Sequence, residues 1–265
     1  MLTPKQVTDL FNKYNVGPSK RFGQNFLIDS NIISKIIQSS EIENKDVVEI
    51  GPGLGSLTHS LLPVAKSVTS YEIDEDMMRV LEGEITEPKF KLEKGDFLEA
   101  NLNWEGKKVL VANIPYNITS DILFKLFENS SKFERAIIMI QKEVGDRLLA
   151  QPNDSEYSKL TVTANHFGKV SKVTLVKSSC FIPAPKVDSM VVRIDFNDND
   201  YSKSDKFMKF VKICFAQRRK TIFNNLKNEY GRDKVIEILS KNNIKESSRP
   251  QELSYEQFIA LFNEI

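Results

Sequence analysis

The chain has 265 residues, of which 40% are hydrophobic and 28% are charged, as is ordinary for a soluble globular protein. It lacks both an apolar run long enough to cross a bilayer and the apolar segment of a signal peptide, so we expect a cytoplasmic protein. Two cysteines and two histidines, far apart in the sequence, support neither a disulfide framework nor a zinc site, and a net charge of +1 means that any nucleic-acid binding requires a local basic patch.

The first predicted elements are a helix over residues 3–14 and a helix that begins after Asp29. The second helix places its apolar residues on one face, which predicts a core position: Ile32, Ile33, Ile36 and Ile37.

The loop between these two helices mixes cations, glycines and aromatic residues without a clear period. Lys20 and Arg21 suit contacts with phosphates. Gln24, Asn25 and the backbone near Leu27 suit a small ligand. A solvated, flexible arm is the alternative, and the loop itself does not decide between the two.

A buried strand over residues 46–50 runs into the glycine-rich turn Gly51-Pro52-Gly53-Leu54-Gly55-Ser56 and then a helix. Glycines remove Cβ atoms, so that a ligand can lie against the backbone. A dinucleotide fingerprint has Gly or Ala at the sixth position, where this chain has Ser56. The turn therefore departs from the nicotinamide fingerprint, and ordinary tight turns use the same residues.

Two further strands, over residues 68–71 and 90–94, are each followed by an acidic residue. Glu72 lies about twenty residues beyond the glycine turn, where a carboxylate can accept hydrogen bonds from a ribose diol. The alternative for Glu72 is a first-turn acid of the helix that begins near Asp74. Asp96 could accept an exocyclic adenine amine, or be a plain turn aspartate.

The next strand, over residues 109–112, ends in the sequence Asn113-Ile114-Pro115-Tyr116. Ligands of α/β sheets lie beyond the carboxyl ends of the strands. A loop there brings a side-chain amide, backbone carbonyls and an aromatic ring into one pocket, which suits a flat amine. The alternative is an ordinary proline turn in which Tyr116 packs on a neighbour.

Strands that alternate with helices predict parallel βαβ units and a doubly wound α/β sheet. The remaining elements of this region are strands over 135–141, 173–176 and 189–196, helices over 118–128 and 142–150, and a segment over 157–167 that fits either type. Two prolines stiffen the loop over 180–188, which would fix Phe181 as a stacking ring. The alternative places Phe181 in the core.

A polar stretch over residues 197–204 indicates a domain boundary, with one domain over 1–198 and a small helical domain over 199–265. The second domain has predicted helices over 207–217, 221–230, 233–242 and 254–263. Its first half is basic, which favours RNA phosphate as a partner over a solvated lysine face: Lys203, Lys206, Lys209, Lys212, Arg218, Arg219, Lys220 and Lys227.

Taken together, the chain resembles the ribosomal RNA adenine dimethyltransferase family of the KsgA (RsmA) type over nearly its whole length. The motifs are Phe22-Gly23-Gln24-Asn25-Phe26-Leu27, Glu49-Ile50-Gly51-Pro52-Gly53-Leu54-Gly55, Glu72, Gly95-Asp96, Asn113-Ile114-Pro115-Tyr116-Asn117-Ile118 and Phe181-Ile182-Pro183-Ala184-Pro185-Lys186-Val187-Asp188-Ser189. The resemblance implies a Rossmann-like sheet that binds S-adenosyl-L-methionine through Asn25, Leu27, Gly51, Glu72, Asp96 and Asn113.

The resemblance also implies N6,N6-dimethylation of two adjacent adenines near the 3′ end of small-subunit (16S) ribosomal RNA, during biogenesis of the small subunit. The implied partner is an immature 30S-type subunit, and we expect a monomer that uses neither a metal nor a membrane. The expected catalytic residues are Asn113, Ile114, Pro115, Tyr116 and Phe181.

The chemistry of these residues agrees with methylation of an amine. The Asn113 side chain and the Ile114 carbonyl would accept the N6 protons, and Tyr116 and Phe181 would stack on a flipped base. Three alternatives remain: the related antibiotic-resistance enzymes that act on large-subunit RNA, a nicotinamide oxidoreductase, and a non-catalytic RNA-binding assembly factor. Ser56 argues against the second, and Asn113 with Tyr116 against the third.

Overall fold

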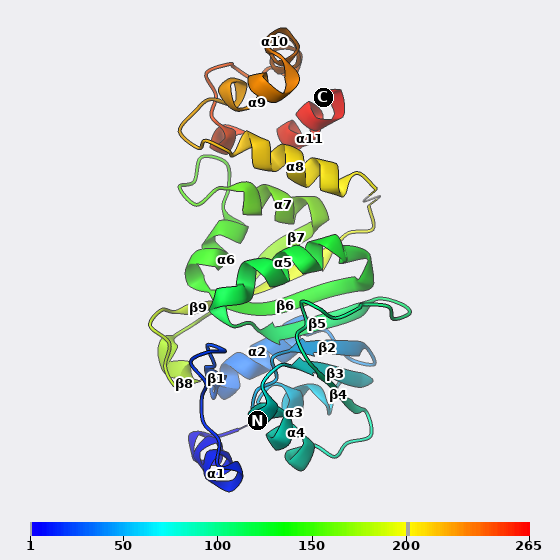
Figure 1. Ribbon diagram of the computed structural model, residues 1–265, viewed down its shortest axis with the longest axis vertical. Coiled ribbons are helices and arrows are strands. Elements are labelled where there is room, and N and C mark those ends of the chain that lie inside the picture. The colour runs from blue at the N-terminus through cyan, green and yellow to red at the C-terminus, as the bar shows by residue number, and fades with distance from the viewer. Residues whose placement is uncertain (1, 200–201) are drawn as a thin grey trace. The chain divides into compact units, whose positions relative to one another are not determined.

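The computed structural model, which describes residues 2–199 and 202–265, contains a seven-stranded sheet with the order β4-β3-β2-β5-β6-β9-β7 (Figure 1). Strands β4, β3, β2, β5 and β6 are parallel, as predicted, and β9 pairs antiparallel with β6. The strands are β2 (Asp46–Ile50), β3 (Ser67–Glu72), β4 (Phe90–Lys94), β5 (Lys108–Asn113), β6 (Phe133–Gln141), β7 (Gly168–Val176) and β9 (Ser189–Phe196).

The order of the strands reverses at β2. Val47 of β2 pairs on one side with Val68 of β3 and on the other with Val109 of β5. From β2 the chain builds the sheet outward through β3 and β4, and then returns to add β5 and β6 on the other side. Ligands of open α/β sheets bind at such a reversal, beyond the carboxyl ends of the strands.

The helices of the sheet region lie close to their predicted ranges. They are α1 (Pro4–Tyr14), α2 (Ser30–Ser40), α3 (Thr58–Leu61), α4 (Glu75–Glu84), α5 (Thr119–Glu128) and α6 (Lys142–Leu149). Asp29 caps α2 as predicted, because its carboxylate accepts the N–H groups of Asn31 and Ile32. Helix α1 packs on α4, where the Tyr14 hydroxyl donates to Glu84 at 2.8 Å.

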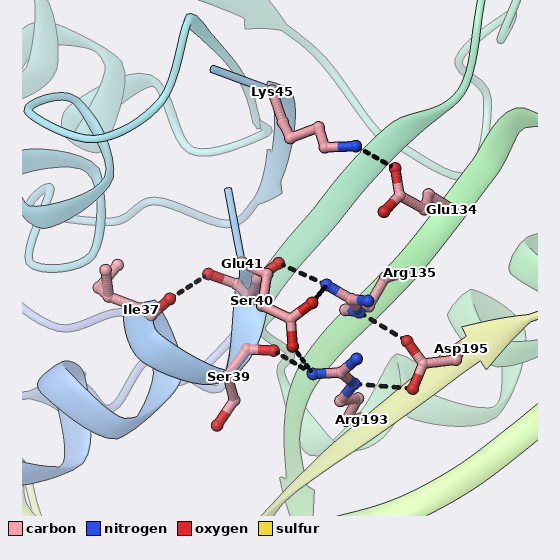
Figure 2. A network of polar contacts seen from close by, with 9 residues as sticks. All are labelled: Ile37, Ser39, Ser40, Glu41, Lys45, Glu134, Arg135, Arg193 and Asp195. Atoms are coloured by element: carbon pink, nitrogen blue, oxygen red, sulfur yellow. Dashed lines mark hydrogen bonds and ion pairs between the residues drawn. The ribbon is translucent and has the colours of Figure 1, made fainter. Parts of the chain in front are cut away.

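A polar network joins the end of α2 to β6 and β9 (Figure 2). Arg135 and Arg193 donate to the carbonyls of the last two residues of α2, each at 3.1 Å. Both guanidinium groups also pair with the same two carboxylates, those of Glu41 and Asp195. Cations here satisfy carbonyls that have no partner within the helix, so the network fixes α2 against the sheet.

A two-stranded sheet that the sequence did not indicate joins β1 (Phe26–Leu27) to β8 (Phe181–Ile182). Each strand has two residues, which is too short to show a period of two. In this sheet Leu27 pairs with Phe181, and the N–H of Ile28 donates to the carbonyl of Cys180 at 2.9 Å. The sheet therefore connects the loop after α1 to the proline-containing loop.

The chain divides into two compact units, the first of Met1–Gly145 and Ser171–Phe196 and the second of Asp146–Val170 and Asn197–Ile265. The second unit resumes at Asn197, next to the predicted boundary, and it also contains Asp146–Val170, which the sequence placed in the first domain. Residues 200 and 201 of the polar stretch lie outside the described residues.

The second unit is helical around its own core. Its helices are α7 (Lys159–Phe167), α8 (Ser204–Cys214), α9 (Ile222–Tyr230), α10 (Arg232–Lys241) and α11 (Tyr255–Glu264). The ambiguous segment becomes α7, because the buried Val162 joins a core with Phe207 and Phe258. Packing therefore outweighs the β-branched composition of this segment.

Candidate active site

A cavity lies in the first unit, beyond the carboxyl ends of β2, β3, β4 and β5. It brings together nine of the ten residues that the sequence predicted for cofactor binding or catalysis: Asn25, Leu27, Gly51, Glu72, Asp96, Asn113, Ile114, Pro115 and Tyr116. The position agrees with the reversal of strand order at β2.

The glycine turn forms one wall of this cavity. Gly51 and Gly53 have φ angles of +64° and +56°, in the left-handed region that favours glycine. A Cβ atom on Gly53 would also come within 3.0 Å of the Phe26 ring. The turn therefore needs glycine for its conformation and for the close approach of β1.

Glu72 lies at the end of β3 and is 5% exposed. Its carboxylate accepts the backbone N–H groups of Gly53 at 3.1 Å and of Ile73 and Asp74 at 3.0 Å. Burial raises the pKa of the Glu72 carboxyl, while these N–H groups act in the opposite direction. The carboxylate thus holds the glycine turn in place and retains a lone pair for a hydroxyl ligand.

Glu49 is a residue of the cavity wall that the sequence analysis did not select as a ligand. It is 1% exposed, and its Oε2 accepts the hydroxyls of Ser70 at 2.6 Å and Thr58 at 2.8 Å. Within the part of the chain that the structure describes, its Oε1 has no hydrogen-bond partner. Burial raises the pKa of this carboxyl to about 7. The signal in the sequence that could have identified Glu49 is that it is an acidic residue within an otherwise apolar strand.

The Asn113 side chain has a defined orientation. Its Nδ2 donates to the backbone carbonyl of Asn25 at 3.0 Å. An amide that donates through its nitrogen to a carbonyl leaves its own oxygen as an acceptor. Asn113 lines the cavity, so this oxygen suits the N–H group of an amine ligand.

The rest of the Asn113 loop is fixed by the sheet. The N–H of Ile114 donates to the carbonyl of Met139 on β6 at 3.1 Å. Tyr116 begins a short 3₁₀ helix, and its hydroxyl is 2.6 Å from the Ser189 hydroxyl on β9. Burial raises the pKa of Tyr116. The Tyr116 ring lines the cavity and is only partly buried, as a stacking ring requires.

The tenth predicted residue, Phe181, does not line the cavity. It is 3% exposed and belongs to the core cluster that also contains Leu27 and Ile33. A stacking role for Phe181 would require the ring to leave this core. Of the two possibilities that the sequence left open, the core position is the one that the structure shows.

Two more cavity residues are relevant to an adenine ligand. Asp96 follows β4, and one of its carboxylate oxygens accepts the N–H of Leu98 at 2.8 Å. Ile73, which the sequence analysis did not select, follows Glu72 and is 46% exposed. A large apolar side chain beside a buried acid offers a surface for the face of a base.

Among residues 2–199 and 202–265, no group of three or more histidine, cysteine, aspartate or glutamate side chains is arranged to hold a metal ion. In the same residues, none of the helices combines the length and the apolar character needed to span a bilayer.

The basic residues of the second unit do not all have the same role. Arg218 donates to the backbone carbonyls of Ser155 and Tyr157, so its guanidinium takes part in the fold of that unit. Arg219 and Lys220 are exposed neighbours. Of these three residues, Arg219 and Lys220 are therefore the ones suited to test a docking surface without a change in the fold.

Comparisons with known proteins point to one family. The family model described as "Ribosomal RNA adenine dimethylase" matches residues 18–265. A relative from Mycoplasma mobile, named "Ribosomal RNA small subunit methyltransferase A", is 46% identical over 247 residues, which cover 93% of this chain and 97% of the relative.

Two solved structures are similar over most of the chain. The structure of a dimethyladenosine transferase from Plasmodium falciparum has a TM-score of 0.78 at 30% identity and covers 89% of this chain and 95% of its own. That of the 23S rRNA methyltransferase ErmE has a TM-score of 0.70 at 29% identity, with coverage of 91% and 99%.

Proposed function

The chain belongs to the ribosomal RNA adenine dimethylase family, and from this premise we propose that it dimethylates N6 of two adjacent adenines near the 3′ end of small-subunit ribosomal RNA. S-adenosyl-L-methionine is the proposed methyl donor. The observation that carries the proposal is the fixed Asn113 amide, whose oxygen remains an acceptor on the cavity wall. The proposed substrate places the reaction in the cytoplasm, on an immature small subunit.

The residues of the cavity fit the proposed cofactor. Glu72 would accept the ribose hydroxyls, Asp96 the exocyclic amine of the cofactor's adenine, and Ile73 would cover the face of that base. Asn25, Leu27 and Gly51 would hold the remainder against the glycine turn. A bound cofactor would supply an electrophilic methyl group on a sulfonium. The unpartnered oxygen of Glu49, once ionised, would offer a compensating negative charge from the cavity wall.

The target adenine would be held by the Asn113 loop. The N6 lone pair is delocalised into the ring. Hydrogen bonds from the N6 N–H groups to the Asn113 oxygen and the Ile114 carbonyl would localise electron density on the nitrogen. Tyr116 stacks on the base. Holding N6 in line with the methyl group supplies the remainder of the catalysis, and the proton leaves after transfer, so a dedicated general base is not required.

Catalysis is proposed for the first unit, which carries the cavity, and RNA docking for residues 199–265, which belong to the second unit. The segment 203–227 carries a series of cations that suits contact with phosphates. The similarity to a 23S rRNA methyltransferase makes large-subunit RNA the alternative substrate. The higher identity to a small-subunit enzyme favours the small subunit.

The test is transfer of radiolabelled methyl groups to immature small subunits, to naked small-subunit RNA and to large subunits in parallel. The proposal predicts N6,N6-dimethyladenosine in small subunits, at two adjacent positions near the 3′ end of the RNA. Labelling of large subunits alone would assign the chain to the alternative substrate, and no labelling of any RNA would contradict the proposed activity.

A further inference from the structure

The side chain of Gln24 is bonded at both ends of its amide. Its Oε1 accepts the N–H of Ser19 at 2.8 Å, which closes the loop of residues 19–24 on itself. Its Nε2 donates to Oδ2 of Asp74 at 2.7 Å, fifty positions along the chain. Gln24 therefore ties this loop to the start of α4.

Asp74 is suited to be the fixed end of this contact. It is 7% exposed, and its Oδ1 caps α4 by accepting the N–H of Asp76 at 2.9 Å. The two carboxylate oxygens thus have separate partners, one in the helix and one in Gln24. A hydrogen bond to a buried carboxylate is stronger than one between neutral groups.

The loop that Gln24 fixes is the one that orients Asn113. The residue after Gln24 is Asn25, whose backbone carbonyl accepts Nδ2 of Asn113 at 3.0 Å. The side chain of Asn25 in turn donates to the carbonyl of Gly23 at 2.9 Å. A displacement of residues 23–25 would therefore remove the partner that holds the Asn113 amide.

We propose that Gln24 and Asp74 are positioning residues, a latch that holds residues 23–25 in place and thereby orients the Asn113 amide toward the substrate amine. The expected effect of the latch on methyl transfer rests on the proposed function. The hydrogen bond between Gln24 and Asp74 does not depend on it. A direct ligand role for Gln24 is the competing explanation. Both ends of the Gln24 amide bind protein groups. A latch depends on the hydrogen bond to Asp74, whereas a direct ligand role for Gln24 does not depend on Asp74.

The test exchanges the two side chains. Gln24→Glu alone sets two carboxylates against each other, and Asp74→Asn alone removes the charged acceptor. In the double variant the new amide of residue 74 can donate to the new carboxylate of residue 24, which keeps an oxygen for Ser19, while the amide oxygen still caps α4. The net charge of the double variant equals that of the wild type. Asp29→Asn makes the same substitution at the N-cap of α2 and is the matched control.

Two measurements separate the latch from a general loss of stability. Lys20 and Arg21 lie within the tied loop, so the rate of tryptic cleavage after them, measured by mass spectrometry in the cofactor-free protein, reports on opening of that loop. Turnover and KM for RNA report on the orientation of Asn113. Thermal melting checks that each variant is folded.

Gln24→Glu is expected to raise cleavage after Lys20 and Arg21 and to lower turnover, each about tenfold or more, the loss expected for one hydrogen bond to a charged partner. KM for RNA should change little, and Asp29→Asn should resemble the wild type. The double variant should recover both rates to within about threefold of the wild type, since it restores the bond.

Failure of the exchange to restore protection from trypsin would overturn the latch, as would an unchanged cleavage rate in Gln24→Glu. Restored protection without restored turnover would overturn its link to Asn113. A wild-type protein that transfers no methyl group would contradict the proposed function, while the cleavage measurement would still decide the contact.

Discussion

Replacement of Glu49 by glutamine is expected to abolish a pH-dependent loss of stability in the first unit. Burial raises the pKa of this carboxyl from 4.5 to about 7. Folding therefore takes up a proton between these pH values, and stability falls as the pH rises through this window. At about 1.4 kcal/mol per pH unit, ionised Glu49 lowers the free energy of unfolding by about 3 kcal/mol above pH 7.

Glutamine is the appropriate replacement because of the contacts that the carboxylate makes. Its oxygen can keep the hydroxyls of Ser70 and Thr58, and its NH₂ group takes the place of the unpartnered Oε1. The substitution also removes repulsion from Glu72, which contributes to the raised pKa. The packing is thus nearly unchanged while the titration disappears.

The assay is urea unfolding at pH 5, 6, 7 and 8, followed by the fluorescence of Trp104. This is the only tryptophan of the sequence and it lies in the same unit as Glu49. The stability of Glu49→Gln relative to the wild type should increase by about 2–3 kcal/mol from pH 5 to pH 8. Burial lowers the pKa of His59 and His166, so their contributions have the opposite sign, but they cancel in this difference.

The control is Glu134→Gln, which removes a partly exposed carboxylate that pairs with Lys45 at 2.7 Å. Its difference from the wild type should vary much less with pH, because surface ion pairs contribute little. A constant difference between Glu49→Gln and the wild type over pH 5–8 would show that the buried carboxyl does not titrate in this window, and would refute the reasoning.

Three further predictions concern the site and the docking surface. Glu72→Ala should weaken S-adenosylmethionine binding about tenfold or more in calorimetric titrations, and unchanged affinity would move the ribose contact to another acid. Asn113→Ala should lower single-turnover methylation by about 10²–10³, whereas Tyr116→Phe keeps the ring and should lower it little; equal losses would make the hydroxyl the working group. Charge reversal of Arg219 and Lys220 to Glu should cripple methylation of ribosomal subunits at a stated salt concentration and leave cofactor affinity intact, and full activity would identify this surface as a solvated face.

The succession of helices and strands along the chain in the sheet region was predictable, because each buried strand is a short apolar run bounded by turn residues. The apolar run over 109–112 lies within β5, and the acid at 72 is the last residue of β3. The sheet of β1 and β8 was not predictable, since strands of two residues show no period. The state of 157–167 was undecided because local propensity conflicts with the period, and burial of Val162 decides it.

The candidate site was predictable to the extent that it depends on the ends of strands. Glu72 and Asn113 end parallel strands and Asp96 follows one, so the fold brings them to one edge of the sheet. Phe181 lies in a segment that the sequence predicted as a loop, for which neither period nor strand order indicates a direction for the side chain. The ring faces the core because β8 pairs with β1, a contact between segments far apart in the sequence.

The orientation of Asn113 shows where sequence reasoning ends. Its partner is a backbone carbonyl, which every residue type possesses, so no side chain in the sequence marks the contact. What determines the contact is the path of residues 23–25, and that path depends on Gln24 and Asp74 as well as on β1. An acceptor that is fixed before the substrate arrives needs no reorganisation during the reaction. The side chain proposed to contact the amine could therefore be located from the sequence, while the fixed orientation of its amide follows only from the fold.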